Sequence, residues 1–332
     1  MRDFAVLGGG QIVELLAGRE TEIIDCVRRA YLTHDAGDSL NPDSYFLRFP
    51  EKPDSRIIAL PAYLGGDVNV AGIKWISSFP ANVATGIPRA SAVIVLNDYG
   101  TGYPFAVLEA AGVSAARTAA SAALAAATLA VRPPESVGIV GGGVIARTIC
   151  RYLPHAGIAP KDVRCHDIDA ASAEALAAHL AAGWAPAART TDAGEALECD
   201  LVVFATTALR PHVAADHVFH PDQLVLNVSL RDLAPELLLT ANNVFDDVEH
   251  CMKADTSPHL AEQLTGGRTF VTGTLAQVLR GEVHTDPTMP TVFSPFGLGV
   301  LDLAVGHLLY TRAETAERLL KVADFFGETT RW

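Results

Sequence analysis

The sequence is poor in cysteine and has no paired cysteines. The five cysteines of this 332-residue chain are odd in number, and none stands in a Cys-x-x-Cys motif. This excludes a disulfide-rich framework and a cysteine-based zinc site, and it favours a reducing compartment. The N-terminus also has no basic region followed by an apolar core, so we expect a cytoplasmic protein.

Positive charge is also scarce. The chain has 25 Lys and Arg against 38 Asp and Glu, a formal net charge of −13, and its basic residues form no block. Such a surface repels phosphate backbones and anionic lipids, which argues against nucleic acid and membranes as partners. Residues 110–131 are apolar and hold one charge, but they are rich in alanine and predict a buried helix rather than a membrane span.

A glycine-rich turn near the middle of the chain predicts a dinucleotide site. A buried strand at 136–141 leads through Gly141-Gly-Gly143-Val-Ile-Ala146 into an amphipathic helix, and a second strand ends at Asp167. Glycines let backbone N–H groups approach a pyrophosphate, while Asp167 can accept a ribose hydroxyl and would repel a 2′-phosphate. We therefore predict NAD. The contacts expected at this turn are Gly141, Gly143, Val144 and Ile145.

A second glycine run, Gly8-Gly-Gly10, imitates this motif. Residues 11–35 after it read as one long helix, with no second strand and no acid for a ribose. We predict no nucleotide site there.

From about residue 129, strands and helices alternate, and the strands are apolar without alternation. This predicts an α/β fold with a Rossmann-type doubly wound parallel sheet. The expected strands are 136–141, 162–167, 200–207, 223–229 and 243–248, and the expected helices are 144–154, 170–182, 193–198, 235–240 and 258–265.

The first 117 residues predict a different, antiparallel arrangement. Extended segments at 44–49, 56–62, 68–78, 91–97 and 103–108 are broken by Pro, Gly and Asn-Asp turns. A last helix, from Gly299 to about Phe326, is expected to pack back on this region. The nucleotide domain, 118–304, would then be inserted in a discontinuous α+β domain of residues 1–117 and 305–332.

Four of the cations upstream of the glycine turn are candidates for binding a substrate: Lys74, Arg117, Arg48 and Arg89. Lys74 alternates with Val70, Gly72 and Ile76 on one strand face, where it either grips an anion and moves protons or reaches water at a strand edge. Arg117 begins an apolar helix and needs a carboxylate, either internal or from a substrate. With Arg48 and Arg89 included, the cations indicate a substrate with several carboxylates, although Arg89 in a loop also fits simple exposure.

Polar residues after the later strands are further candidates. Asp232 follows the strand at 223–229, where parallel sheets place catalytic groups, although helix capping before Pro235 explains it equally. Thr206 and Thr207 end a strand and either touch the cofactor or satisfy backbone groups. His212, His217 and His220 are interrupted by prolines and offer no helix face, so we predict no metal site.

Several motifs spread over nearly the whole chain fit one known family. They are Gly72-Ile-Lys74-Trp, Arg117-Thr-Ala-Ala, Gly141-x-Gly143-x-x-Ala146, Asp167 and Ser294-Pro-Phe-Gly297. Together they resemble the ornithine cyclodeaminase/mu-crystallin family. Gly86-Ile-Pro-Arg89 and Ser229-Leu-Arg-Asp232 are similar to its branch of N-[(2S)-2-amino-2-carboxyethyl]-L-glutamate dehydrogenases, which make 2,3-diaminopropionate for siderophores and peptide antibiotics.

The resemblance implies NAD-dependent oxidation and hydrolysis of that glutamate adduct, in a homodimer formed through the N-terminal domain. It places Arg48, Lys74 and Arg117 on a carboxylate and Asp232 beside the reacting amine, and it extends the expected cofactor contacts to Ser229 and Ser294. Cyclodeaminases lack an arginine at the place of Arg89 and have a glycine-rich segment at Ser229-Leu-Arg. Alanine dehydrogenase, ketimine reductase, ornithine cyclodeaminase and a nucleotide-dependent binding protein of mu-crystallin type remain alternatives.

Overall fold

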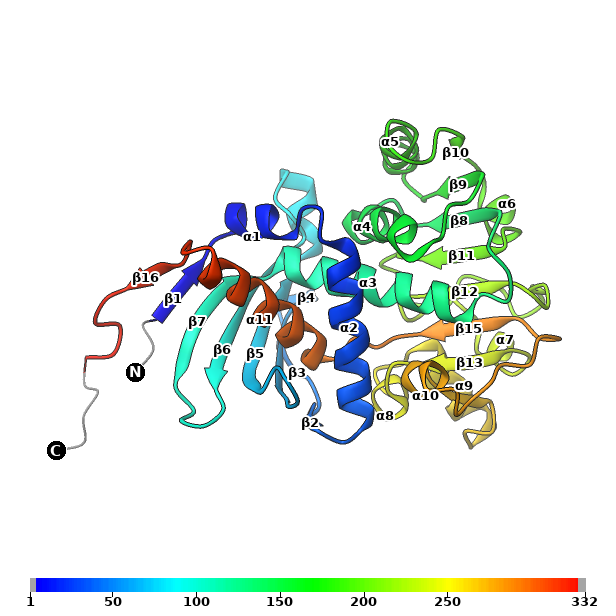
Figure 1. The fold of residues 1–332 in the computed structure, drawn as a ribbon. Helices are drawn as coiled ribbons and strands as arrows, with labels where there is room; N and C mark the ends of the chain where they lie inside the picture. The colour runs from blue at the N-terminus through cyan, green and yellow to red at the C-terminus, as the bar shows by residue number, and fades with distance from the viewer. Residues whose placement is uncertain (1–3, 328–332) are drawn as a thin grey trace. The chain divides into compact units, whose positions relative to one another are not determined.

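The computed structural model describes residues 4–327 of the chain (Figure 1). The chain forms two compact units. The first runs to Arg117 and resumes at Leu298, and the second comprises Thr118–Gly297. The C-terminal return thus begins before the expected position 305, because the helix that starts at Gly299 packs on the first unit.

The first unit is built on a mixed sheet of eight strands in the order β16-β1-β7-β6-β5-β4-β2, with β3 paired to β4. Neighbours from β7 to β2 are antiparallel, as expected for segments joined by short turns, whereas β1 runs parallel to β7. The strands are β1 (Phe4–Leu7), β2 (Ser39–Leu40), β3 (Tyr45–Phe49), β4 (Lys52–Leu64), β5 (Val70–Ser78), β6 (Ala90–Asp98), β7 (Pro104–Glu109) and β16 (Leu320–Val322).

The helices of this unit correct two expectations. The single helix predicted at 11–35 is two helices, α1 (Gly9–Leu16) and α2 (Glu20–Asp35), because Ala17 is extended and Gly18 has a φ of 68°. The final helix, α11 (Gly299–Thr315), ends well before Phe326, since Glu317 has a φ of 53° and β16 then pairs with β1. α11 packs on α2, β4, β5 and β6, as expected. A 3-10 turn, η1, spans Pro80–Thr85.

The second unit contains a fully parallel sheet in the order β10-β9-β8-β11-β12-β15-β13-β14. The predicted α/β class and doubly wound parallel sheet are confirmed. The expected strands are β8 (Ser136–Val140), β9 (Asp162–His166), β11 (Leu201–Phe204), β12 (Leu224–Asn227) and β13 (Asn242–Phe245); β10 (Ala188–Thr190), β14 (Val271–Thr274) and β15 (Thr291–Ser294) were not predicted.

The direction of winding reverses between β8 and β11, so the carboxyl ends of these two strands form the switch point at which open α/β sheets bind ligands. The helices of the unit are α4 (Val144–Tyr152), α5 (Ala170–Ala181), α6 (Ala193–Leu197), α7 (Pro235–Leu238), α8 (Val248–Cys251), α9 (Ser257–Thr265) and α10 (Leu275–Leu279), with a 3-10 turn, η2 (Leu153–Ala156).

The alanine-rich helix α3 (Ala111–Leu129) continues from the first unit into the second. Most of its alanines are fully buried, which confirms a helix packed on most sides within the protein. Across the described residues, no helix combines the length and apolarity that a bilayer crossing requires.

Candidate functional site

The glycine turn lies at the switch point. Gly141 has a φ of 104°, and a Cβ added there would lie 2.5 Å from the carbonyl oxygen of Ala205, which follows β11. Gly143 caps α4 and has open space around it, while Ala146 is fully buried. The three positions therefore provide a tight turn, an open approach to backbone N–H groups and close helix packing, as a pyrophosphate site needs. The side chain of Val144 is exposed and that of Ile145 is half-buried.

Asp167 stands directly after β9, beside this turn. One carboxylate oxygen accepts the backbone N–H of Gly142 at 2.6 Å, and the other accepts that of Asp169 at 2.9 Å. These bonds fix the carboxylate next to the glycine turn. Each oxygen keeps a lone pair for a ribose hydroxyl.

The remaining expected cofactor contacts are four hydroxyl residues, and the structure gives them different surroundings. Thr206 and Ser229 lie after β11 and β12 and bond the same carboxylate, whereas Thr207 is exposed. Ser294 is buried at the end of β15, and its hydroxyl accepts the side-chain N–H of Asn227 at 3.2 Å. The cofactor roles of these four residues stay predictions.

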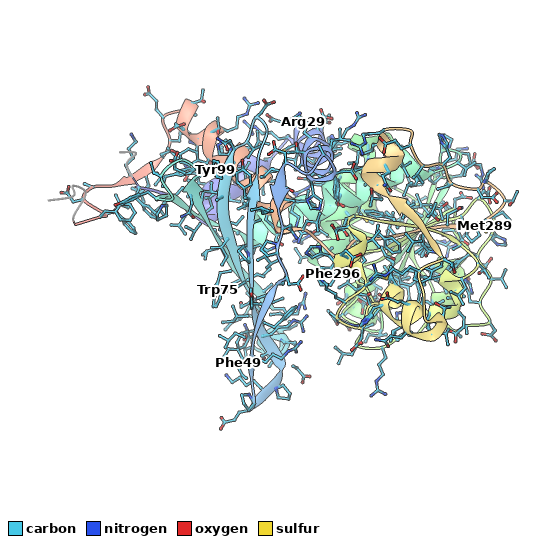
Figure 2. The ribbon with its side chains drawn as sticks, turned by 90° about the horizontal axis from the view of Figure 1, so that it is seen from below. Arg29, Phe49, Trp75, Tyr99, Met289 and Phe296 are labelled. Carbon is cyan, nitrogen blue, oxygen red and sulfur yellow. The ribbon has the colours of Figure 1, made fainter. Side chains whose placement is uncertain are left out.

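The chain beyond Ser294 is held by a buried aspartate. Asp246 accepts the backbone N–H of Phe296 at 2.9 Å and that of Gly297 at 2.7 Å (Phe296 is labelled in Figure 2). Burial raises the pKa of Asp246, and these N–H donors partly oppose that effect. The Ser294-Pro-Phe-Gly297 motif is thereby fixed in one conformation.

Lys74 lies on the central strand β5, under α11. It is 2% exposed, and its Nζ lies 2.5 Å from Oδ2 of Asp302 and 3.3 Å from the Ser114 hydroxyl. An edge lysine reaching water is therefore ruled out. The Nε of Arg117 lies 3.1 Å from Oδ1 of the same Asp302. Two of the four predicted cations thus converge on one carboxylate.

Burial has a direct effect on the charge of Lys74. It lowers the pKa of Lys74 from 10.5 to about 8, with Arg117 acting in the same direction and Asp302 opposing both. Lys74 is therefore mostly protonated at neutral pH. Two cations and one carboxylate then leave one net positive charge in the cluster of Lys74, Arg117 and Asp302, which we call the first-unit cluster.

Asp302 was missed by the sequence analysis. It lies in the first turn of α11, where the helix dipole favours a carboxylate, and it is fully buried. The signal that could have found it is an acid within the otherwise apolar run Gly299–Gly306. Such an acid needs a cationic partner.

The other two predicted cations do not join this cluster. Strand pairing places Arg48 opposite Arg56 and Arg56 opposite Ser78, while Arg89 is half-buried and donates to the Ser78 hydroxyl at 3.2 Å. Arg48 itself is exposed, because the whole of β3 is exposed or half-buried. Burial lowers the pKa of Arg89. Arg56, a cation that we had not predicted, lies between them.

Arg48, Arg56 and Ser78 nevertheless share a face of the sheet with Lys74. Directly paired residues point to the same side, so the alternation on β5 puts Ser78 on the face of Lys74, about 13 Å further along the strand. Of the four predicted cations, Lys74 and Arg117 meet at the internal Asp302, whereas Arg48 and Arg89 stand apart from that cluster. The roles of all four toward a substrate stay predictions.

Asp232 is the centre of a second buried cluster, at the carboxyl ends of β11 and β12. Its side chain is fully buried. Oδ1 accepts the Thr206 hydroxyl at 2.5 Å and faces Nε2 of His212 at 3.0 Å, and Oδ2 accepts the Ser229 hydroxyl at 2.5 Å. We call Asp232, Thr206, Ser229 and His212 the second-unit cluster. The sequence analysis considered His212 only as a metal ligand.

The loop that carries Ser229 and Asp232 is strained at Leu230, which has a φ of 80°. A non-glycine residue there costs of the order of 1–3 kcal/mol, and such strain concentrates at functional sites. The loop is held by two bonds: the Ser257 N–H donates to the Leu230 carbonyl, and the Ser257 hydroxyl donates to the Leu233 carbonyl. Asp232 is not a helix cap, because α7 has Ala234 at its N-cap and no side-chain cap bond. Its side chain instead bonds Thr206 and Ser229 at the ends of β11 and β12.

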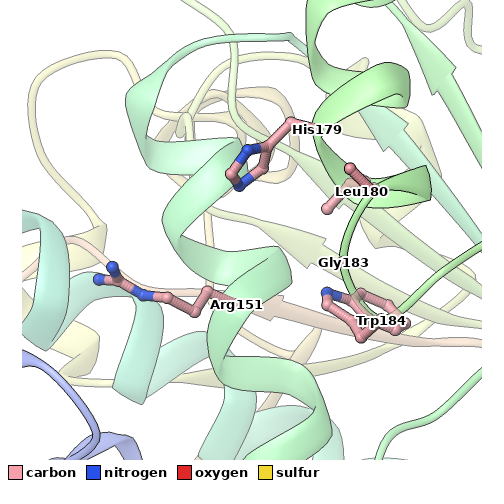
Figure 3. A pocket seen from close by; sticks show the side chains of 6 residues that line it. Arg151, His179, Leu180, Gly183 and Trp184 are labelled. Carbon is pink, nitrogen blue, oxygen red and sulfur yellow. The ribbon is translucent and has the colours of Figure 1, made fainter.

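Two further features lie outside these clusters. A cavity of about 320 Å³ is found at the carboxyl ends of α4 and α5, away from the glycine turn (Figure 3); it is lined by Arg151, His179, Leu180, Ala182, Gly183 and Trp184. The described residues contain no group of three His, Cys, Asp or Glu placed to hold a metal. His217 packs on Phe219, and His220 pairs with Glu198.

The chain is similar over most of its length to known dehydrogenases. The chain is 28% identical to the alanine dehydrogenase of Archaeoglobus fulgidus over 88% of its length and 90% of the relative's. It is 27% identical to the N-((2S)-2-amino-2-carboxyethyl)-L-glutamate dehydrogenase of Staphylococcus aureus over 91% of its length and 93% of the relative's. A solved archaeal alanine dehydrogenase dimer with bound NAD matches with a TM-score of 0.87 at 26% identity, covering 98% of this chain and all of that one.

The model of one family matches residues 12–317, which include the glycine turn and both clusters. The chain therefore belongs to the ornithine cyclodeaminase/mu-crystallin family.

Proposed function

We propose that the protein is an NAD-dependent dehydrogenase that oxidises N-[(2S)-2-amino-2-carboxyethyl]-L-glutamate and hydrolyses it to 2,3-diaminopropionate and 2-oxoglutarate. The observation that carries the proposal is the first-unit cluster, in which two cations share one buried carboxylate. The positive charge that remains suits a substrate carboxylate. The S. aureus relative of that name supports the choice of substrate.

The residues at the switch point fit NAD. Gly141 leaves no room for a side chain, Gly143 opens the amino end of α4, and Asp167 stands where a ribose would lie. NAD, when bound, supplies the acceptor for the hydride that leaves the glutamate α-carbon.

In this proposal, side chains of the protein bind the substrate carboxylate and transfer protons. Lys74 and Arg117 bind a carboxylate of the substrate. The second-unit cluster, with Asp232 at its centre, takes the proton from the secondary amine as the carbon–nitrogen double bond forms, and Lys74 polarises the water that adds to this bond. Returning the proton to nitrogen then breaks the carbon–nitrogen bond. Adduct, NAD⁺ and water give the two products, NADH and one proton.

The arginines near Ser78 would bind further carboxylates. The Arg89 guanidinium reaches Ser78, which shares the sheet face of Lys74, so Arg89→Gln should raise KM for the three-carboxylate adduct about tenfold and leave KM for alanine unchanged. Arg231→Gln, at an arginine that bonds backbone carbonyls of another loop, is the control. Equal effects on the adduct and on alanine would contradict this role.

The decisive experiment incubates the protein with NAD and the synthetic adduct, follows NADH, and identifies the products by mass. The proposal predicts one 2,3-diaminopropionate and one 2-oxoglutarate per NADH. Oxidation of alanine alone would favour alanine dehydrogenase, which the A. fulgidus relative supports. Deamination of ornithine without net NADH would indicate a cyclodeaminase. NAD binding without any turnover would indicate a binding protein.

We also propose a homodimer that forms through the sheet of the first unit. On the face opposite Lys74, the paired residues Tyr45, Ala59, Trp75 and Val93 cross four strands, and Tyr45, Trp75 and Val93 are 71%, 43% and 40% exposed. Figure 2 labels Trp75 on this sheet. Such an apolar row is typical of a partner surface, and the archaeal alanine dehydrogenase is a dimer. Trp75→Glu should give monomers in light scattering, whereas an unchanged mass would contradict this interface.

A further inference from the structure

Asp232 has no path to solvent of its own. Its side chain is fully buried, and both carboxylate oxygens are already occupied by the Thr206 hydroxyl, the Ser229 hydroxyl and the His212 ring. A proton that leaves or reaches this carboxylate must pass through one of these three partners. Hydroxyl groups do not change charge near neutral pH, whereas imidazole does.

His212 is the partner with an open side. Its side chain is 44% exposed, and the contact with Asp232 uses Nε2. An ionised carboxylate can only accept a hydrogen bond, so Nε2 carries the hydrogen in the neutral ring and the lone pair is on Nδ1. The edge of the ring that bears Nδ1 is therefore the basic edge.

Two backbone hydrogen bonds and one ring contact fix this orientation. The backbone N–H groups of His212 and Val213 both donate to the Asp232 carbonyl at 2.9 Å, so the two loops are joined at the main chain as well. The Phe204 ring packs against the imidazole at 6.1 Å between centroids, near the edge-on arrangement. Asp232 is a charged group in direct contact with the ring, and Thr206 bonds that carboxylate.

The location of the ring matches a role in proton transfer. Thr206 follows β11 immediately after Ala205, whose carbonyl lies against Gly141, so the second-unit cluster stands beside the switch point. Asp167, on the far side of β8, marks the ribose half of the expected dinucleotide site. The second-unit cluster lies in the other half, where the reactive end of a dinucleotide would lie.

We propose that His212 is the residue that exchanges the proton with the substrate or its hydrolytic water, through Nδ1, and that Asp232 is a positioning residue that orients the ring and stabilises its charged form. The amine loses its proton to Nδ1 as the carbon–nitrogen double bond forms, and the charged ring returns it when that bond breaks. This inference rests on the proposed dehydrogenase function and gives its proton a carrier.

The test compares His212→Gln with His220→Gln. Glutamine can still reach Asp232 with a side-chain N–H but does not titrate. His220 makes the same type of contact, from Nε2 to Glu198 at 3.1 Å, and is exposed outside the cluster. His212→Gln should lower kcat at least about 100-fold and remove the acid limb of the kcat/KM profile, with NAD affinity and thermal stability unchanged. His220→Gln should change none of these.

A second measurement does not depend on turnover. Ring carbon and nitrogen chemical shifts should show the Nε2–H tautomer of His212 in the wild type, and Asp232→Asn should remove this preference. The opposite tautomer in the wild type would overturn the inference. So would a His212→Gln variant that keeps its kcat and acid limb while Asp232→Asn loses activity, because Asp232 would then exchange protons through a hydroxyl.

The activity measurements distinguish a failure of the His212 inference from a failure of the proposed substrate. If the wild type oxidises alanine but not the adduct, the substrate proposal fails and the variants are compared with alanine. If the wild type oxidises the adduct and His212→Gln does so equally well, only the His212 inference fails. A wild type that oxidises no amino acid overturns both.

Discussion

Asp302 in the first unit and Asp232 in the second are both fully buried, but their hydrogen-bond partners have opposite chemistry. Asp302 in the first unit faces two cations, Lys74 and Arg117. Asp232 in the second unit faces two hydroxyl groups and an imidazole. The two cations around Asp302 exceed its single negative charge, so the first-unit cluster keeps one positive charge. The second-unit cluster keeps a negative charge unless a proton enters.

In the proposed function, this difference suits complementary roles for the two clusters. A buried ion pair keeps its charge and suits the binding of an anion, whereas a carboxylate supported by neutral donors suits the orientation of a ring that takes up and returns a proton. Burial alone does not identify either role. The chemical type of the hydrogen-bond partners is what distinguishes the two clusters.

The largest effect is expected from removing the cation of the first-unit cluster. Lys74→Ala should lower kcat/KM about 1000-fold, because a preorganised positive charge is lost, while the Kd for NAD stays within about twofold. Steady-state kinetics and NAD titration measure the two quantities. Lys161→Ala, at an exposed lysine paired with Glu135, is the control. A parallel loss of NAD affinity in Lys74→Ala would show that the two roles are not separate.

The next effect concerns stability. Asp302→Asn leaves Lys74 and Arg117 buried together without an anion, so the free energy of unfolding should fall by about 3 kcal/mol. Asp222→Asn removes a carboxylate that pairs with Arg132 at the surface and should cost less than about 1 kcal/mol. Denaturant titration compares the two variants. A similar loss of unfolding free energy in the two variants would mean that water reaches the first-unit cluster more than its burial indicates.

The pH dependence follows from the lowered pKa of Lys74, about 8. Above that pH Lys74 becomes neutral, so kcat/KM for a carboxylate substrate should fall about tenfold per pH unit. The folded protein holds this proton less tightly than the unfolded chain, whose lysine has a pKa of 10.5. Stability should therefore rise with pH between about 8 and 10.5, since the penalty for a buried charge disappears. Lys74→Met should abolish both trends.

The smallest effect is expected at the ribose position. Asp167→Ala should raise the Kd for NAD about tenfold, because a charge-assisted hydrogen bond is lost, and should narrow the preference for NAD over NADP. Asp169→Ala, two residues further on and exposed, should leave both unchanged. Calorimetric titration with each nucleotide measures the effect. Unchanged NAD binding in Asp167→Ala would place the ribose elsewhere.

Local patterns were sufficient for most of the second unit. The run of glycines, the apolar strands and the acid at Asp167 predicted the parallel sheet and its glycine turn, because each feature depends on residues close in sequence. The pattern failed at 11–35, where a single glycine in a positive-φ conformation divides an otherwise continuous helical periodicity. It failed again after Thr315, because pairing of β16 with β1 is a long-range contact.

The candidate site was predicted only in part, and for the same reason. Lys74, Arg117 and Asp232 stood out as polar residues in apolar surroundings. Their partners did not, since Asp302 is 228 residues from Lys74 and His212 is 20 residues from Asp232. Arg48 looked buried because its neighbours are apolar, yet β3 is largely exposed.

The sequence by itself determined the fold class, the glycine turn and the presence of isolated charges, because backbone conformation and hydrophobic periodicity are local properties. Only the tertiary structure decided which charges meet. A buried carboxylate takes its chemistry from the groups that the fold brings within about 3 Å of it, and sequence spacing does not record that distance.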